Sequence, residues 1–148
     1  MTRVTAAATG VLLLSSTLPA VGDGEARRLE LLNERGRRVW VAPIAAGESF
    51  DVSFIHSSER CRWTQHYREH ARRIEQTAST FPCYGAGMPT DRPTETTSAA
   101  FRVAAAQELG ELVMRHSRGA DITIGHRGAA YRVADHLNDG ERFVLRVR

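Results

Sequence analysis

Lysine is absent from this sequence, and no basic block takes its place. All 20 positively charged residues are arginine, and 17 acidic residues leave a formal net charge of +3 over 148 residues. The arginines are dispersed along the chain, whereas proteins that bind nucleic acid carry a clustered basic patch. We therefore predict a solvated surface of mixed charge and no nucleic-acid partner.

Long apolar runs are also missing. The most apolar stretch, 11–14, is flanked by small and hydroxyl residues, and a membrane-spanning helix needs about 20 apolar residues. With Arg3 before it and Ala20 and Gly22 after it, this stretch is typical of a cleaved export signal. We predict a signal peptide over residues 1–22, cut after Gly22 or, alternatively, after Ala20. An uncleaved single anchor is the other interpretation.

Export has consequences for location and for domain organisation. The mature chain, 23–148, has the usual size of one small domain and contains no long linker. We predict a single β-rich domain in the periplasm or another extracytoplasmic compartment. It would have no stable membrane span once the signal is removed.

Cysteine is scarce, with Cys61 and Cys83 only. In an oxidising compartment, two cysteines in a chain of this size predict one disulfide. If the chain reverses around Arg72, opposed residues have numbers that sum to 144. This register places Cys61 opposite Cys83, Trp63 opposite Phe81 and Tyr67 opposite Thr77. Such a bridge would contribute about 3 kcal/mol to stability.

Alternation of apolar and polar residues predicts strands through most of the chain. Leu29 and Leu31 alternate with charged neighbours, and Phe50, Val52 and Phe54 share one face of a second strand. Frequent turn residues separate such segments. We predict a compact antiparallel sandwich or barrel-like domain.

The segment from Phe101 to His116 is ambiguous. Its spacing of alanine and larger apolar residues fits a short helix around 99–109 with Ser98 as N-cap, although Gly110 weakens a longer helix by about 1 kcal/mol. The alternative is two short strands, followed by a hairpin over 112–126. We expect strands throughout and keep the helix as an alternative.

The first chemical candidate is the run His56, Ser57, Ser58 and Glu59 at a predicted strand end. An imidazole, hydroxyls and a carboxylate could form half of a metal site or part of a hydrolytic site. However, no GxSxG motif is present, and one histidine with one glutamate cannot fill a zinc shell. A strand-end turn is the structural alternative, and we predict that the protein is not an enzyme.

The second candidate is the loop formed by Gly85, Ala86, Gly87, Met88 and Pro89. Its glycines allow a tight turn or a close approach to a ligand. Neither a lysine nor a predicted helix follows, so the loop lacks the features of a phosphate site. The remaining histidines form no convergent cluster in the sequence, and we predict no metal or other cofactor: His66, His70, His116, His126 and His136.

Several of these motifs resemble the bacterial family called domain of unknown function 1850. The resemblance is carried by Trp40, Gly47-Glu48-Ser49-Phe50, Phe54-Ile55-His56-Ser57, Glu59 and the Gly85–Pro89 loop. Met88 replaces the usual leucine of the family, and Ser58 replaces a more common valine. The cysteine pair is not a family feature, so the predicted disulfide depends on the register alone.

The resemblance implies a biological role for the protein and does not imply a particular reaction. Members of this family look like small exported β-domains that are often encoded near TRAP transporters of the TAXI type. By this association we expect an accessory or binding protein whose partner is a TRAP membrane subunit or solute receptor. The site implied by the family pattern is His56, Ser57, Glu59 and Gly85 to Pro89. Alternatives are a small metal-binding or hydrolytic protein that uses His56 and Glu59, and a structural envelope protein.

Overall fold

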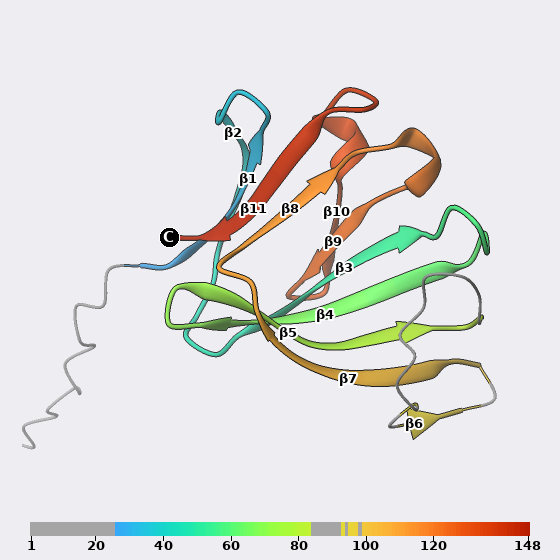
Figure 1. Ribbon diagram of the computed structural model, residues 1–148. Coiled ribbons are helices and arrows are strands. Elements are labelled where there is room, and N and C mark those ends of the chain that lie inside the picture. Colours follow the sequence, from blue (N-terminus) through green and yellow to red (C-terminus); the bar gives the residue numbers. More distant parts are fainter. Residues whose placement is uncertain (1–25, 84–92, 94, 98) are drawn as a thin grey trace, which may run out of the picture.

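The computed structural model describes residues 26–83, 93, 95–97 and 99–148, and these form two antiparallel sheets that face each other (Figure 1). The four-stranded sheet has the order β2-β1-β11-β8, and the seven-stranded sheet has the order β10-β9-β3-β4-β5-β7-β6. The prediction of an antiparallel β-fold is confirmed, and the two open sheets form a sandwich. The strands are β1 (Arg28–Asn33), β2 (Arg38–Pro43), β3 (Ser49–Ile55), β4 (Arg62–His70), β5 (Arg73–Phe81), β6 (Glu95–Thr96), β7 (Phe101–Glu108), β8 (Glu111–Arg115), β9 (Thr123–His126), β10 (Ala129–Arg132) and β11 (Arg142–Val147).

The main core lies between the sheets and follows directly from the alternation in the sequence. Leu31 of β1 and Leu145 of β11 are fully buried, and Val52 of β3 and Ile74 of β5 meet them from the other sheet. Burying each such side chain contributes about 1.5–3 kcal/mol. Aromatic contacts extend this core, since the rings of Trp40 and Tyr131, which belong to different sheets, lie 4.9 Å apart.

A second, smaller core lies on the seven-stranded sheet. Trp63, Phe81 and Val103 are buried there, with Phe54 and Phe101 packed against them. These residues come from β3, β4, β5 and β7. This second core holds together the part of the sheet that carries the disulfide.

The ambiguous segment forms strands, so the alternative of a short helix around 99–109 is wrong. β7 pairs with β5 from Phe101 opposite Phe81 to Glu108 opposite Glu75, and this pairing satisfies backbone groups that a helix would satisfy internally. Gly110, with φ of +68°, then lets the chain leave one sheet and enter β8 of the other. The predicted N-cap, Ser98, lies outside the described residues.

The β4–β5 hairpin does not keep a single register along its length. Near the turn Tyr67 pairs with Gln76, so the predicted pair of Tyr67 with Thr77 is wrong. The register then shifts by one residue, and farther along Thr64 pairs with Thr80. The irregularity adds the residue that brings the two cysteines into line. As predicted, Trp63 contacts Phe81, with ring centroids 5.4 Å apart, and Cys61 bonds to Cys83.

The predicted hairpin over 112–126 is also wrong. β8 pairs with β11, whereas β9 pairs with β3 and β10. A 3₁₀ turn (η1, Arg118–Ala120) and Asp121, with φ of 42°, carry the chain from one sheet to the other. In the observed arrangement, Ile122 and Ile124 enter the core from the seven-stranded sheet, opposite the apolar face of β1 and β11.

The disulfide gives a direct test of this hairpin. Cys61 and Cys83 are 22 residues apart in sequence, and we expect Cys61→Ser/Cys83→Ser to lower the free energy of unfolding by about 3 kcal/mol. The measurement is urea unfolding followed by tryptophan fluorescence. Wild-type protein with a reductant should match the double variant. Equal midpoints for oxidised wild type and the double variant would show that the bond does not stabilise the fold.

Candidate functional site

The His56–Glu59 run forms the turn that joins β3 to β4. The His56 backbone N–H donates to the Cys61 carbonyl, and the Arg60 N–H donates back to the His56 carbonyl, each at 2.9 Å. The left-handed conformation of Arg60, with φ of 56°, completes the reversal. The Glu59 N–H approaches Nδ1 of His56 at 3.5 Å. The turn is therefore closed mainly by its two backbone hydrogen bonds, and the imidazole adds one longer contact.

The ring of His56 covers part of the smaller core. It stacks on Trp63, with ring centroids 4.4 Å apart and planes 13° apart. Trp63 itself contacts Phe54 at 6.0 Å. His56 therefore has a structural role through its ring, and any binding role must come from its polar edge.

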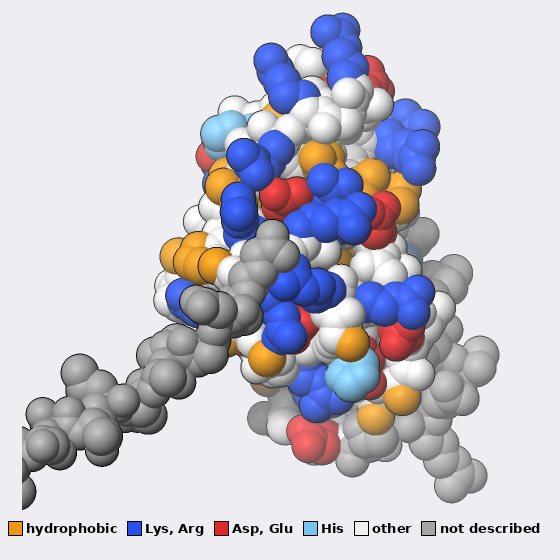
Figure 2. All heavy atoms as spheres, turned by 90° about the vertical axis from the view of Figure 1, so that its left-hand side faces the viewer, with side chains coloured by type: hydrophobic (Ala, Val, Ile, Leu, Met, Phe, Trp, Pro, Cys, Tyr) orange, Lys and Arg blue, Asp and Glu red, His pale blue; other side chains and the backbone are white. Residues whose placement is uncertain are grey.

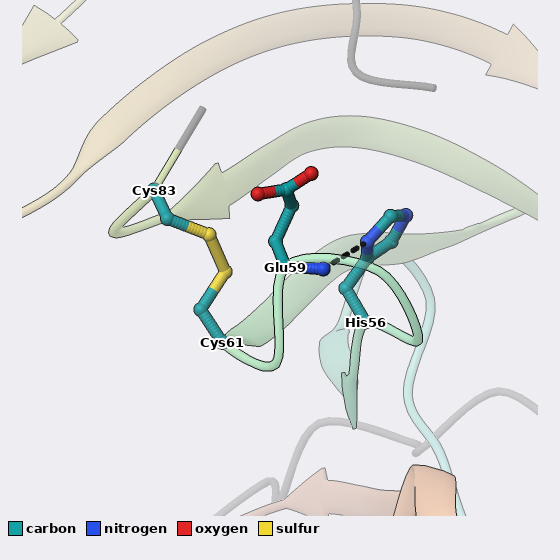
Figure 3. The surroundings of a disulfide bond; sticks show 4 residues. All are labelled: His56, Glu59, Cys61 and Cys83. Atoms are coloured by element: carbon teal, nitrogen blue, oxygen red, sulfur yellow. Dashed lines mark hydrogen bonds between the residues drawn. A yellow bond between two sulfur atoms is a disulfide. The ribbon is translucent and has the colours of Figure 1, made fainter. Parts of the chain in front are cut away.

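The disulfide connects this turn to the start of the second predicted loop. Figure 3 shows His56, Glu59 and the Cys61–Cys83 bond together, with the Glu59 side chain extending from the turn. The Cα atoms of the two cysteines are 6.5 Å apart. Gly85, Ala86, Gly87, Met88 and Pro89 lie outside the described residues, but Cys83 is only two positions before Gly85. The chain is thus anchored beside His56, Ser57 and Glu59 immediately before that loop.

The Gly47-Glu48 motif has a structural explanation. Gly47, with φ of +73°, donates its N–H at 2.9 Å to the carboxylate of the buried Glu69. Glu48 accepts hydrogen bonds from Arg127 at 2.6 and 2.8 Å and from the Ala45 N–H at 2.6 Å. The motif therefore fastens the β2–β3 turn to neighbouring strands.

The surroundings of Glu48 strongly favour the ionised carboxylate over the protonated acid. The hydrogen bond from Arg127, followed by that from the Ala45 backbone, lowers the pKa of Glu48 to about 2, from an ordinary value near 4.5. Nε2 of the buried His126 lies 3.2 Å from the same carboxylate and can only add to this bias if protonated. This site is a structural ion pair.

One polar arrangement was missed at the sequence level, where His66 was considered a scattered surface histidine. Its Nδ1 lies 2.7 Å from the carboxylate of Asp51, and its Nε2 lies 2.8 Å from the hydroxyl of Thr80. The three residues link β3, β4 and β5. Their order resembles that of a hydrolase triad, yet they occupy mid-strand positions whose core-facing neighbours are Phe50, Val52 and Tyr67. Only the register, and no local motif, could have revealed this contact.

Two of the other histidines have partners of their own, away from the His56 turn. His136 stacks on Tyr131, with ring centroids 4.9 Å apart. His116 is buried, and its backbone N–H donates to the Glu141 carbonyl. Within residues 26–83 and the described parts of 93–148, no three histidine, cysteine or acidic residues are grouped to hold a metal ion. In the same residues, no helix combines the length and the apolar character needed to cross a bilayer.

Comparison with protein families gives one match. The family model described as a domain of unknown function (DUF1850) matches residues 50–133, more than half of the chain. The matched range includes His56, Ser57, Glu59, both cysteines and the Gly85–Pro89 loop. No curated protein and no solved structure matches the chain.

The Glu48 ion pair predicts a pH-dependent stability. Because the pKa of Glu48 is lower in the folded than in the unfolded chain, its contribution is complete above about 4.5 and is lost as the pH falls toward 2. We expect Glu48→Gln to lower the free energy of unfolding at neutral pH by on the order of 1 kcal/mol, since solvent screens a partly exposed pair. Chemical denaturation over this pH range measures the effect.

The matched control for Glu48→Gln is Glu34→Gln, at an exposed position of the β1–β2 turn. Its difference from wild type should change little over the same range. A Glu48→Gln deficit that stayed constant down to pH 2 would contradict the ion-pair account.

Proposed function

The chain belongs to the domain of unknown function 1850 family, and we propose that it is an exported accessory protein that binds a component of a TRAP transporter of the TAXI type. The partner is the membrane subunit or the solute receptor. The association rests on the family resemblance, because members of this family are often encoded near such transporters. The disulfide is compatible with an extracytoplasmic location.

The observation that carries the proposal is the link between two family motifs. The turn with His56, Ser57 and Glu59 is bonded through Cys61 to Cys83, and Cys83 leads into Gly85 to Pro89. Cys61 and Cys83, which are 22 residues apart in the sequence, are thereby held together beside the His56 turn. The His56 turn is anchored by the disulfide and by its stack on Trp63, so it would lose little conformational freedom on binding.

We propose binding and not catalysis because of what surrounds His56. Its Nδ1 faces the Glu59 backbone N–H, and its ring is stacked on Trp63. Catalysis by His56 would call for a substrate proton or a nucleophile within hydrogen-bond reach of the imidazole. The described contacts give this alternative, and that of a metal site using His56 and Glu59, less support.

The test separates the polar edge of His56 from its packing role. His56→Phe keeps an aromatic ring on Trp63 and removes both ring nitrogens, whereas His56→Ala removes the stack as well. We expect His56→Phe to unfold within about 0.5 kcal/mol of wild type and to bind the purified TAXI solute receptor or TRAP membrane subunit at least about tenfold more weakly. Isothermal titration calorimetry measures the affinity, and urea unfolding measures the stability.

Glu59→Gln gives a second readout at the same turn, and His136→Phe serves as a histidine control stacked on Tyr131, outside the proposed contact. The control should bind as wild type does. If His56→Phe bound normally while His56→Ala lost stability, the turn would be a structural feature only. Failure of the wild-type protein to bind either transporter component would contradict the proposed function.

A further inference from the structure

The outer face of the four-stranded sheet gathers arginines that are far apart in the sequence. Leu29 and Leu31 of β1 and Phe143 and Leu145 of β11 point into the core, so the alternate residues of these strands point outward. Figure 2 shows this side of the molecule, where arginine side chains outnumber acidic ones. We call this surface the arginine face, and its basic residues are Arg28, Arg38, Arg115, Arg142, Arg146 and Arg148.

The arginine face has more positive charge than its own glutamates can balance. Glu30 is buried and already accepts hydrogen bonds from Arg38 at 2.9 Å and Arg146 at 3.1 Å. Glu111 lies 3.7 Å from Arg148 and 4.0 Å from Arg146. These contacts hold the guanidinium groups in place and leave a net positive surface.

One pair of like charges lies on this face, and one of its members, Arg115, also donates a hydrogen bond to the Gly140 carbonyl. Arg142 of β11 lies directly opposite Arg115 of β8. Like charges opposed across an antiparallel pair destabilise a sheet. An anionic group bound between them would offset that repulsion.

An apolar row crosses the arginine face. The row begins at Leu32 of β1, which pairs with Val144 of β11, and Val144 pairs in turn with Val113 of β8. Val113 is 48% exposed, and Val41 of β2, on the same face, is 44% exposed. A hollow of about 230 Å³ lies here, and its lining includes Leu32 and Val144, Arg142 and Arg146, and also Glu34 and Glu111. Arginine next to exposed apolar side chains is typical of protein interfaces.

We propose that the arginine face is a docking surface for an acidic segment of a protein partner. A guanidinium group can bind a carboxylate through two parallel hydrogen bonds, which lysine cannot do. The apolar row would contact apolar side chains of the same partner. A phosphate backbone has no apolar groups to match the apolar row. A protein partner is therefore favoured over a nucleic acid.

The inference does not depend on the proposed function. The arginine face belongs to the four-stranded sheet, whereas the His56 turn follows β3 of the seven-stranded sheet. Dispersal of arginine along the sequence gave no sign of this surface, because residues 28, 38, 115 and 142–148 meet only through strand pairing.

The test uses a fluorescein-labelled oligo-glutamate peptide and fluorescence anisotropy at low and at physiological ionic strength. We expect the wild-type protein to bind the peptide, more weakly as salt rises. Arg142→Glu/Arg148→Glu should bind at least about tenfold more weakly. This variant replaces the Arg142–Arg115 repulsion by an attraction, so we expect urea unfolding to show no loss of stability from that position.

The matched control is Arg118→Glu/Arg132→Glu, which changes the net charge equally at exposed positions near β9 and β10. It should bind the peptide within about twofold of wild type, since long-range charge effects are screened. Equal losses in both double variants would overturn the proposal by showing a net-charge effect only. Absence of peptide binding, or preferred binding of a DNA oligonucleotide or phosphatidylglycerol vesicles of the same charge, would also overturn it.

Discussion

The register of the β4–β5 hairpin is the constraint on which the rest of the proposed site depends. A shift of one residue would turn Trp63 and Tyr67 from the core to the outer face. It would also separate Cys61 from Cys83, whose bond anchors the His56 turn. The irregularity at Thr77 reconciles a tight turn at Ala71-Arg72 with the alignment of the cysteines farther along. The backbone irregularity in this hairpin therefore also determines how the cysteines that anchor the His56 turn are aligned.

The family motifs divide into two kinds when their contacts are compared. Gly47 and Glu48 make hydrogen bonds within the protein, Gly47 to Glu69 and Glu48 with Arg127. His56 and Glu59 lie on the turn that joins β3 to β4 at the end of the sheet, where the His56 ring stacks on Trp63. A motif of the first kind maintains the scaffold, and one of the second kind can also present groups to a partner. This division is the physical basis for the proposed contact surface.

Much of the fold was predictable from the sequence because strand alternation is a local property. The positions of Leu31, Val52 and Leu145 in the core follow from period-two patterns. The Cys61–Cys83 bond was predictable because this pair and the Trp63–Phe81 pair fit the same register, whereas the shift of register nearer the turn was not predicted. The alanine-rich segment 101–108 was ambiguous because alanine fits a helix, and only its pairing with β5 decides for a strand.

Long-range arrangements could not be predicted in this way. The contact of His66 with Asp51 and Thr80 needs the order of three strands, and the arginine face needs the pairing of β11 with both β1 and β8. The alternation of apolar and polar residues does not specify the order of strands in a sheet, because many orders bury the same apolar faces. Surface chemistry built from several strands therefore appears only with the fold.

The central claim is that the His56 turn and the Gly85–Pro89 loop act as one binding surface. Hydrogen–deuterium exchange of the mature protein, with and without the TAXI solute receptor or the TRAP membrane subunit, tests it most directly. The account predicts that amides of residues 56–61 and 84–92 gain protection together when the partner is added, while the β1–β2 turn does not change. Protection of one segment without the other, or protection elsewhere only, would contradict the claim.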